Sequence, residues 1–277
     1  MARTSSPTAR RRQLGSLLRT RRLALGMTVD EVAKHLLVSP SKISRAETGQ
    51  RSVSARDIRD LAELYRLSAE ERDLLDELAA GGKERAWWQP FNLPYSYATY
   101  VGLEADATSI RDFALGVLPG LLQTERYAEA VARAMRPSIP AESLSQLVQA
   151  RLERQRRVLR ETRTNFTALL DEGTLRRVVG GEEVMREQAR ALLTAAELPN
   201  VAIRLVPFDA GPLPAPTNKF ILLAFDGLPD VVFLETMTGQ LFLERDNELR
   251  AYQDAFLILE GLALTADETR DRILAFE

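Results

Sequence analysis

The chain has 277 residues, of which 45% are hydrophobic and 27% are charged, a composition typical of folded soluble domains. This length suits one large domain or two smaller ones. Cysteine is absent, which excludes disulfides and cysteine-ligated metal sites, and the single histidine, His35, cannot form a pair of zinc ligands. We therefore expect a protein without metal, cofactor or enzymatic activity.

The formal net charge of −2 combines a basic N-terminal part with an acidic remainder. Residues 1–66 hold 14 Lys and Arg against 6 Asp and Glu, a balance of +8, and the other 211 residues have a balance of −10. This segregation favours nucleic-acid binding by the first part and another role for the second. No apolar run reaches the roughly 18–20 residues of a membrane span, and no secretory signal is visible, so we expect a cytoplasmic protein.

The N-terminal part predicts a flexible arm followed by a helical bundle. Residues 1–11 are small, polar and basic, as in a mobile arm. Arginines of such an arm can enter a minor groove; the candidates are Arg3, Arg10, Arg11 and Arg12. From residue 12 to residue 80 the apolar residues have helical spacing, which predicts an all-α bundle of five short helices. Four hydroxyl residues stand at helix N-cap positions: Thr28, Ser39, Ser54 and Ser68.

The rest of the chain predicts a linker and an α+β domain. Residues 81–100 are rich in proline and aromatics and predict a linker that packs on a neighbouring domain. In residues 101–277, helical spacing recurs at about 103–116, 124–135, 141–163, 182–196, 248–264 and 266–275. Apolar runs predict strands at 166–170, 201–206, 220–225, 231–235 and 240–244. Because the last three strands follow one another closely, we expect a mostly antiparallel sheet of about five strands, covered by helices.

Residues 28–49 predict two short helices that meet at a tight turn. Ser39 can cap the second helix, and Pro40 occupies its first turn, where a missing N–H costs nothing. A recognition helix in the major groove needs short polar side chains near its start and a long arginine one turn later. The outward side chains of the second helix meet this need: Ser41, Lys42, Ser44 and Arg45.

A second set of residues is placed to contact the DNA backbone. The predicted phosphate contacts are Thr28, Ser39, Arg19, Arg22, Arg51 and Arg56. The alternative is a small bundle whose basic face is only solvated. The ordered motif and the local excess of positive charge favour double-stranded DNA as the partner.

Residues 14–66 resemble the Xre/phage-repressor family of helix-turn-helix proteins. The residues that carry the resemblance are, in order, Leu14-Gly15, Gly26-Met27-Thr28, Val32-Ala33, Val38-Ser39, Ile43-Ser44 and Glu47-Thr48-Gly49. The resemblance implies base-contacting positions at Pro40, Ser41 and Arg45. Three residues depart from the family pattern. Val29 replaces a phosphate-binding Gln, Leu37 replaces a Gly in a left-handed turn, and the Pro40 side chain cannot donate to a base.

The second half resembles the C-terminal domain of actinobacterial WhiJ-like regulators, a domain described as antitoxin-like. Its marks here include residues 118–128, 151–155, 170–172, 179–181, 185–188, 198–208, 231–236 and 239–240. The resemblance implies a transcriptional regulator that works with a small partner protein, and it brings no catalytic residues.

Together these observations predict a homodimeric, sequence-specific regulator that binds an inverted-repeat operator and a small acidic partner protein. The candidate docking residues for that partner are Arg151, Arg154 and Arg157 on one predicted helix. The alternative for these arginines is a solvated helix face with ion pairs four residues apart. The alternative for the second half is a domain that senses a small-molecule ligand.

Overall fold

The computed structural model describes residues 6–161, 164–214, 218–236 and 239–276. The chain divides into two compact units. The first consists of the residues up to Gln89 together with Ala98–Asp106, and the second of Pro90–Tyr97 together with the residues from Ala107 onward. The boundary therefore differs from the predicted linker at 81–100. Along the described ranges, no helix has the length and hydropathy needed to cross a membrane.

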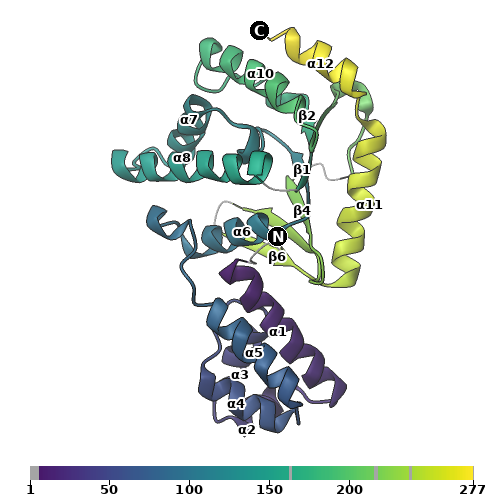
Figure 1. Cartoon of the computed structure of the whole chain (residues 1–277). Helices are drawn as coiled ribbons and strands as arrows, with labels where there is room; N and C mark the ends of the chain where they lie inside the picture. The colour runs from purple at the N-terminus through teal and green to yellow at the C-terminus, as the bar shows by residue number, and fades with distance from the viewer. Residues whose placement is uncertain (1–5, 162–163, 215–217, 237–238, 277) are drawn as a thin grey trace. The chain divides into compact units, whose positions relative to one another are not determined.

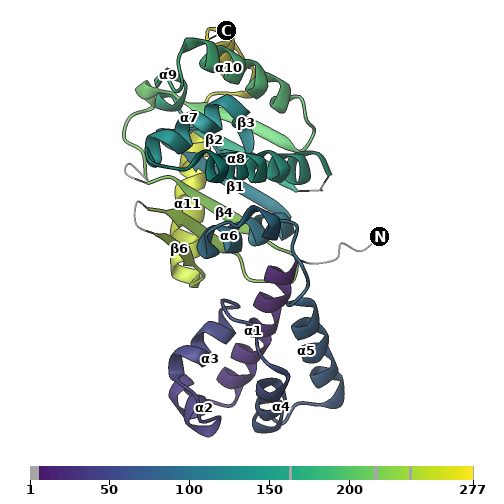
Figure 2. The same ribbon diagram turned by 90° about the vertical axis from the view of Figure 1, so that its left-hand side faces the viewer.

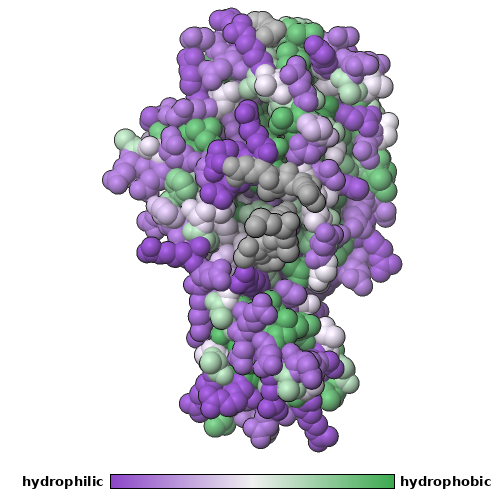
Figure 3. Space-filling model, in the orientation of Figure 1, coloured by the Kyte–Doolittle hydropathy of each residue, from purple (hydrophilic) through white to green (hydrophobic). Residues whose placement is uncertain are grey.

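The first unit is helical (Figures 1 and 2), and apolar side chains of residues 14–79 pack into one core cluster. The core contains Leu14, Leu18, Val32, Ile43 and Leu61, each at most 4% exposed. Hydrophilic residues predominate on the side of this unit seen in Figure 3. The helices of its N-terminal region are α1 (Pro7–Ala24), α2 (Val29–His35), α3 (Pro40–Glu47), α4 (Ala55–Leu64) and α5 (Ala69–Gly81).

The predicted N-caps are confirmed, because the four hydroxyl oxygens accept hydrogen bonds from backbone N–H groups at the starts of α2 to α5. The predicted linker contributes a 3₁₀ turn (Gln89–Phe91) and the start of α6 (Tyr95–Asp106). Its Trp88 is buried in the first unit, against Gly102. Residues 95–100 are therefore helical rather than extended linker.

The prediction of a flexible arm is wrong for residues 7–11, which form the start of α1. Pro7 occupies the first turn, and the Ser6 hydroxyl accepts a hydrogen bond from the Ala9 N–H at 3.2 Å. Arg10 pairs with Glu84 at 3.0 Å, and Arg12 is 4% exposed. Arg11 lies half-buried on the same helix. Arg3 falls outside the described residues.

The second unit is built on a six-stranded mixed sheet with the order β3-β2-β1-β4-β5-β6. The pairs β1–β2 and β2–β3 are parallel, and the other three pairs are antiparallel. The prediction of a mostly antiparallel sheet of about five strands is therefore wrong. The strands are β1 (Ser109–Ala114), β2 (Asn165–Asp171), β3 (Val201–Val206), β4 (Phe220–Ala224), β5 (Val231–Glu235) and β6 (Gln240–Leu243).

The strand that the sequence prediction missed is β1. It occupies a central position in the sheet and lies within residues 103–116, where a helix is expected. In β1, Ile110, Phe113 and Ala114 are buried, and the pattern of burial does not alternate. A short strand covered on both faces has no period of two residues, so its apolar run cannot be distinguished from part of a buried helix. The parallel pairing of β1, β2 and β3 follows from the helical crossovers between them.

Helices cover both faces of this sheet (Figure 1). α7 (Glu125–Met135), α8 (Ala141–Gln155) and α10 (Glu182–Ala196) lie on one face and α11 (Asp246–Leu262) on the other. The Phe220 ring of β4 packs between the sheet and α11. It lies 5.7 Å from the Phe113 ring of β1 and 6.3 Å from the Phe256 ring of α11, measured between ring centroids. After α8 the chain makes a π-helical turn (Arg156–Glu161). The helices are α7 (Glu125–Met135), α8 (Ala141–Gln155), α9 (Gly173–Arg176), α10 (Glu182–Ala196), α11 (Asp246–Leu262) and α12 (Ala266–Leu274).

Candidate nucleic-acid interface

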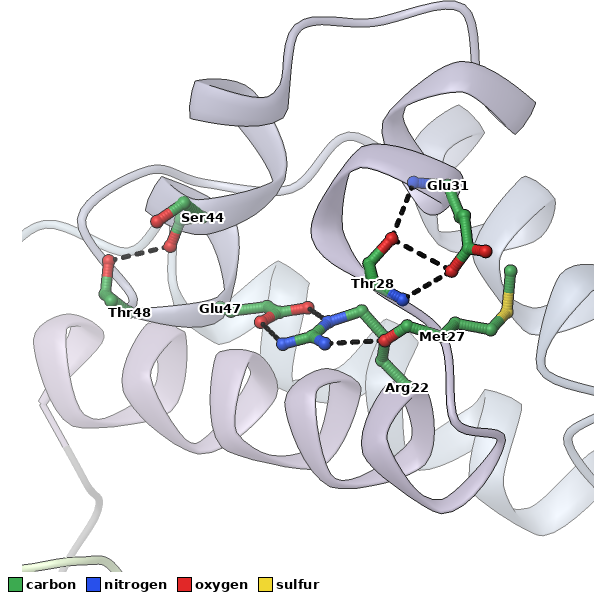
Figure 4. A network of polar contacts seen from close by, with 7 residues as sticks. All are labelled: Arg22, Met27, Thr28, Glu31, Ser44, Glu47 and Thr48. Carbon is green, nitrogen blue, oxygen red and sulfur yellow. Dashed lines mark hydrogen bonds and ion pairs between the residues drawn. The ribbon is translucent and has the colours of Figure 1, made fainter. Parts of the chain in front are cut away.

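α2 and α3 form the two helices that the 28–49 segment predicts. A capping box starts α2: the Thr28 hydroxyl accepts from the Glu31 N–H at 3.2 Å, and the Thr28 N–H donates to the Glu31 carboxylate at 2.7 Å (Figure 4). At α3, the Ser39 hydroxyl accepts from the Lys42 N–H at 3.3 Å. Only residues 36–39 separate the two helices. Both helix starts are therefore set by local sequence.

The turn between α2 and α3 contains a strained residue. Leu37 has φ 55°, in the left-handed region, and its side chain is 93% exposed. A β-carbon in this conformation crowds the following carbonyl and costs about 1–2 kcal/mol. The exposed side chain packs on little that could offset this cost, so Leu37 weakens the turn between α2 and α3.

We expect Leu37→Asn to raise the free energy of unfolding of the first unit by about 1 kcal/mol, because Asn tolerates the left-handed conformation. Urea unfolding of the full chain followed by tryptophan fluorescence measures this, since both tryptophans, Trp87 and Trp88, belong to the first unit. The control Leu37→Ala also has a β-carbon but lacks the side-chain amide of Asn. Its free energy of unfolding should therefore rise much less. An equal gain for both variants would show that the exposed apolar side chain, and not the backbone, is the source of the cost.

α3 separates a buried face from an exposed one. Ile43 is 4% exposed and Ala46 is 8% exposed, and both pack in the core. Ser41, Ser44 and Arg45 are exposed, and the Arg45 Nε donates to the Ser41 carbonyl at 3.2 Å. Pro40 is also exposed. Four of the five predicted base-contacting residues are thus accessible on one short helix.

Lys42 is the exception, because its ammonium lies 2.7 Å from the Asp57 carboxylate of α4. Burial acts to raise the pKa of Asp57, but hydrogen bonds from Lys42 and Ser54 outweigh it and lower the pKa overall. The ion pair joins α3 to the start of α4. Lys42 is therefore held against α4 and is not among the freely accessible side chains of α3.

The prediction that Arg22 contacts phosphate is wrong. Its guanidinium is buried and makes two hydrogen bonds to Glu47, at 2.6 and 2.8 Å, and a third to the Met27 carbonyl at 2.8 Å (Figure 4). The hydrogen bonds that the guanidinium donates to Glu47 raise the pKa of Arg22. This cluster joins α1 to the end of α3 and to the segment before α2. Arg22 therefore holds the end of α3 against α1.

Tyr65 lies in the electrostatic field of the same cluster. Burial, aided by the negative charge of Glu47, raises the pKa of Tyr65 to about 12. Its hydroxyl is buried and has no hydrogen-bond partner among the described residues. The sequence motif includes Glu47, but neither its pairing with Arg22 nor the proximity of Tyr65 can be inferred from spacing alone.

The other predicted phosphate contacts are accessible. Thr28 and Ser39 are exposed N-cap residues, and Arg19 and Arg51 are exposed. Arg56 is 86% exposed and lies 3.8 Å from Asp60, a weak surface pair. These five residues are compatible with contacts to a DNA backbone.

The prediction that Arg154 belongs to an exposed docking face on α8 is wrong, because Arg154 is only 3% exposed. Its guanidinium lies 5.4 Å from the centroid of the Tyr97 ring and donates to the Tyr97 hydroxyl. Arg157 pairs with Glu153 at 2.7 Å on its own helix, and Arg156, followed by Arg157, holds the pKa of Glu153 at about 2. Arg151 is half-buried and donates to Gln123. The three arginines therefore do not form a common exposed surface.

Models of two protein families match the chain. A family described as a helix-turn-helix domain matches residues 13–75, which identifies the first unit's helical region as a module of this class. A family described as a domain of unknown function (DUF5753) matches residues 97–275, more than half of the chain. The chain belongs to this DUF5753 family. No curated protein and no solved structure matches it significantly.

Proposed function

We propose that this protein is a dimeric, sequence-specific transcriptional regulator of the Xre type. The helix-turn-helix domain suggests a DNA-binding regulator. The observation that carries the proposal is the exposed face of α3, where Ser41, Ser44 and Arg45 stand free of the core while Ile43 and Ala46 hold the helix in place. In this proposal, α3 enters the major groove and these three side chains meet base edges.

The surrounding charge supports the same orientation. Five accessible residues contact phosphates in this proposal: Thr28, Ser39, Arg19, Arg51 and Arg56. The balance of +8 over residues 1–66 supplies attraction to the duplex that does not depend on its sequence. A single recognition helix covers only a few base pairs, so the proposal includes a dimer on half-sites about 34–36 Å apart.

For the second unit we propose the binding of a small partner protein, as the resemblance to WhiJ-like regulators suggests. Partner binding then changes operator affinity by thermodynamic linkage, with no catalytic step. The arginines of α8 and of the π-helical turn after it do not form a common docking surface for this partner, because Arg154 is buried and Arg157 is paired with Glu153.

Substitutions at Arg45 and Arg51 separate base reading from phosphate binding. We expect Arg45→Ala to reduce discrimination at one base pair by about 1–3 kcal/mol, because a bidentate contact to guanine is lost. We expect Arg51→Ala to weaken binding to all duplexes alike and to lower the salt dependence by about one ion. Titration of the preferred duplex and its single-base variants measures both effects.

Arg45→Lys is the matched control, because it keeps the charge but loses the planar fork. It should retain overall affinity and lose discrimination nearly as far as Arg45→Ala. If Arg45→Ala and Arg45→Lys both keep the wild-type preference at every base pair, α3 is not the element that reads the sequence.

A further inference from the structure

The second unit contains a cavity of about 320 Å³ among α7, α8, the end of β5, the start of β6 and the start of α6. This volume lies in the range of small-molecule sites, roughly 300–1,000 Å³. One part of the wall is apolar and another part carries charged and amide groups. The lining residues that matter here are Tyr97, Val131, Met135, Leu147, Arg151 and Gln240.

Two polar atoms of this lining are buried without a hydrogen-bond partner among the described residues. They are the Arg151 Nε, a charged donor, and the Gln240 Oε1, an acceptor. Buried polar groups in folded proteins are nearly always paired, so each exception requires an explanation. Arg151 comes from α8 and Gln240 from β6, so two elements that are distant in the sequence each bring one unsatisfied group to the same cavity.

Positive charge is in excess around the cavity. Arg136 and Arg151 line it, and the one acidic side chain of its lining, Glu235, forms an ion pair with Lys219 at 2.5 Å. Burial acts to raise the pKa of Glu235, but Lys219 and then the nearby arginines of α8 outweigh it and lower the pKa overall. Glu235 is therefore ionised at neutral pH and occupied by Lys219. Arg151 donates to the neutral Gln123, and among the described residues no carboxylate is hydrogen-bonded to its guanidinium.

A neighbouring cavity of about 520 Å³ provides a useful comparison. Apolar, proline and polar residues from 91–94 and 136–147 line it, and none of its described lining residues has a buried polar side-chain atom without a partner. Size alone would favour that cavity. The unsatisfied donor and acceptor favour the smaller one.

We propose that the cavity beside Arg151 binds a small organic acid with an apolar body and one N–H or O–H donor. The acid group accepts from Arg151, the donor meets the Gln240 Oε1, and the apolar body packs on Val131, Met135 and Leu147. All of these residues belong to the second unit. The site therefore does not depend on the DNA-binding proposal, and its test needs no DNA.

The probe for the test is 1-anilinonaphthalene-8-sulfonate, which carries a sulfonate, aromatic rings and an N–H donor. Fluorescence titration of the full chain should give one saturable site. Arg151→Gln should weaken the affinity at least tenfold, because the charged hydrogen bond to the sulfonate is lost. The matched control Arg157→Gln changes an arginine of the π-helical turn that continues α8, one that does not line the cavity, and should stay within twofold of wild type.

The neutral analogue N-phenyl-1-naphthylamine separates charge from apolar contact, and it should bind wild type and Arg151→Gln equally. Gln240→Glu is a second, nearly isosteric variant on the edge strand β6, and repulsion of the sulfonate should weaken affinity at least fivefold. Near-ultraviolet circular dichroism checks that each variant is folded. Absence of saturable binding, or affinity within twofold of wild type in a folded Arg151→Gln or Gln240→Glu variant, would overturn the proposal.

Discussion

Glu47→Ala is expected to lower the free energy of unfolding of the first unit by about 3–5 kcal/mol. The substitution leaves the Arg22 guanidinium buried, with two of its three hydrogen bonds removed. A charge taken out of water and left without its partner costs far more than the pair itself contributes. Because Arg22 and Glu47 join α1 to α3, the loss should also loosen the orientation of the recognition helix.

Urea unfolding followed by tryptophan fluorescence measures this loss in the full chain. The matched control is Asp60→Ala, which removes an acid from an exposed pair with Arg56 and should cost less than about 1 kcal/mol. The double variant Arg22→Met/Glu47→Leu should recover most of the loss, because no buried charge remains. A Glu47→Ala loss no greater than that of Asp60→Ala would contradict the assignment of this cluster to the core.

Gly49→Ala is the second large effect, expected at about 3–4 kcal/mol. Gly49 follows α3 with φ +68°, where a β-carbon costs about 1–2 kcal/mol. That β-carbon would also lie 2.7 Å from the Arg12 Cα and 2.8 Å from the Arg12 N. Because these are backbone atoms of α1, the helix itself must move, and overpacking of this kind costs about 1–3 kcal/mol more.

Gly26→Ala separates the two contributions. Gly26 has φ +66°, nearly the same conformation, but a β-carbon there would meet nothing within 4 Å. It should therefore cost only about 1–2 kcal/mol, the part due to conformation. The same unfolding measurement applies to both variants. Equal losses at the two glycines would show that α1 does not approach the end of α3 as closely as the structure describes.

Local sequence signals predicted the helix-turn-helix region well. The N-cap hydroxyls, the proline at the start of α3 and the glycine after it act within a few residues, and the structure confirms the caps of α2 to α5. The exposed positions of Ser41, Ser44 and Arg45 follow from the same local pattern, because Ile43 and Ala46 set which face of α3 is buried.

The errors concern residues whose position depends on distant partners. Arg22 and Arg154 look like surface arginines in sequence, yet Glu47 and Tyr97 draw them into the interior. Lys42 has the spacing of a base-contacting residue, but Asp57 of α4 engages it. No local pattern reports such pairings, since arginine and lysine occur at the surface in most contexts.

The central claim is that α3 reads DNA as part of a dimer. Selection of bound duplexes from a random library by the full chain, followed by titration of the selected duplex against salt, tests it most directly. The proposal predicts an inverted repeat with half-sites about 10–10.5 base pairs apart. It also predicts that the logarithm of the affinity falls, for each tenfold rise in salt, by about 0.9 units per phosphate contacted, which amounts to several units in all. No enriched sequence, together with an affinity that does not respond to salt, would contradict it.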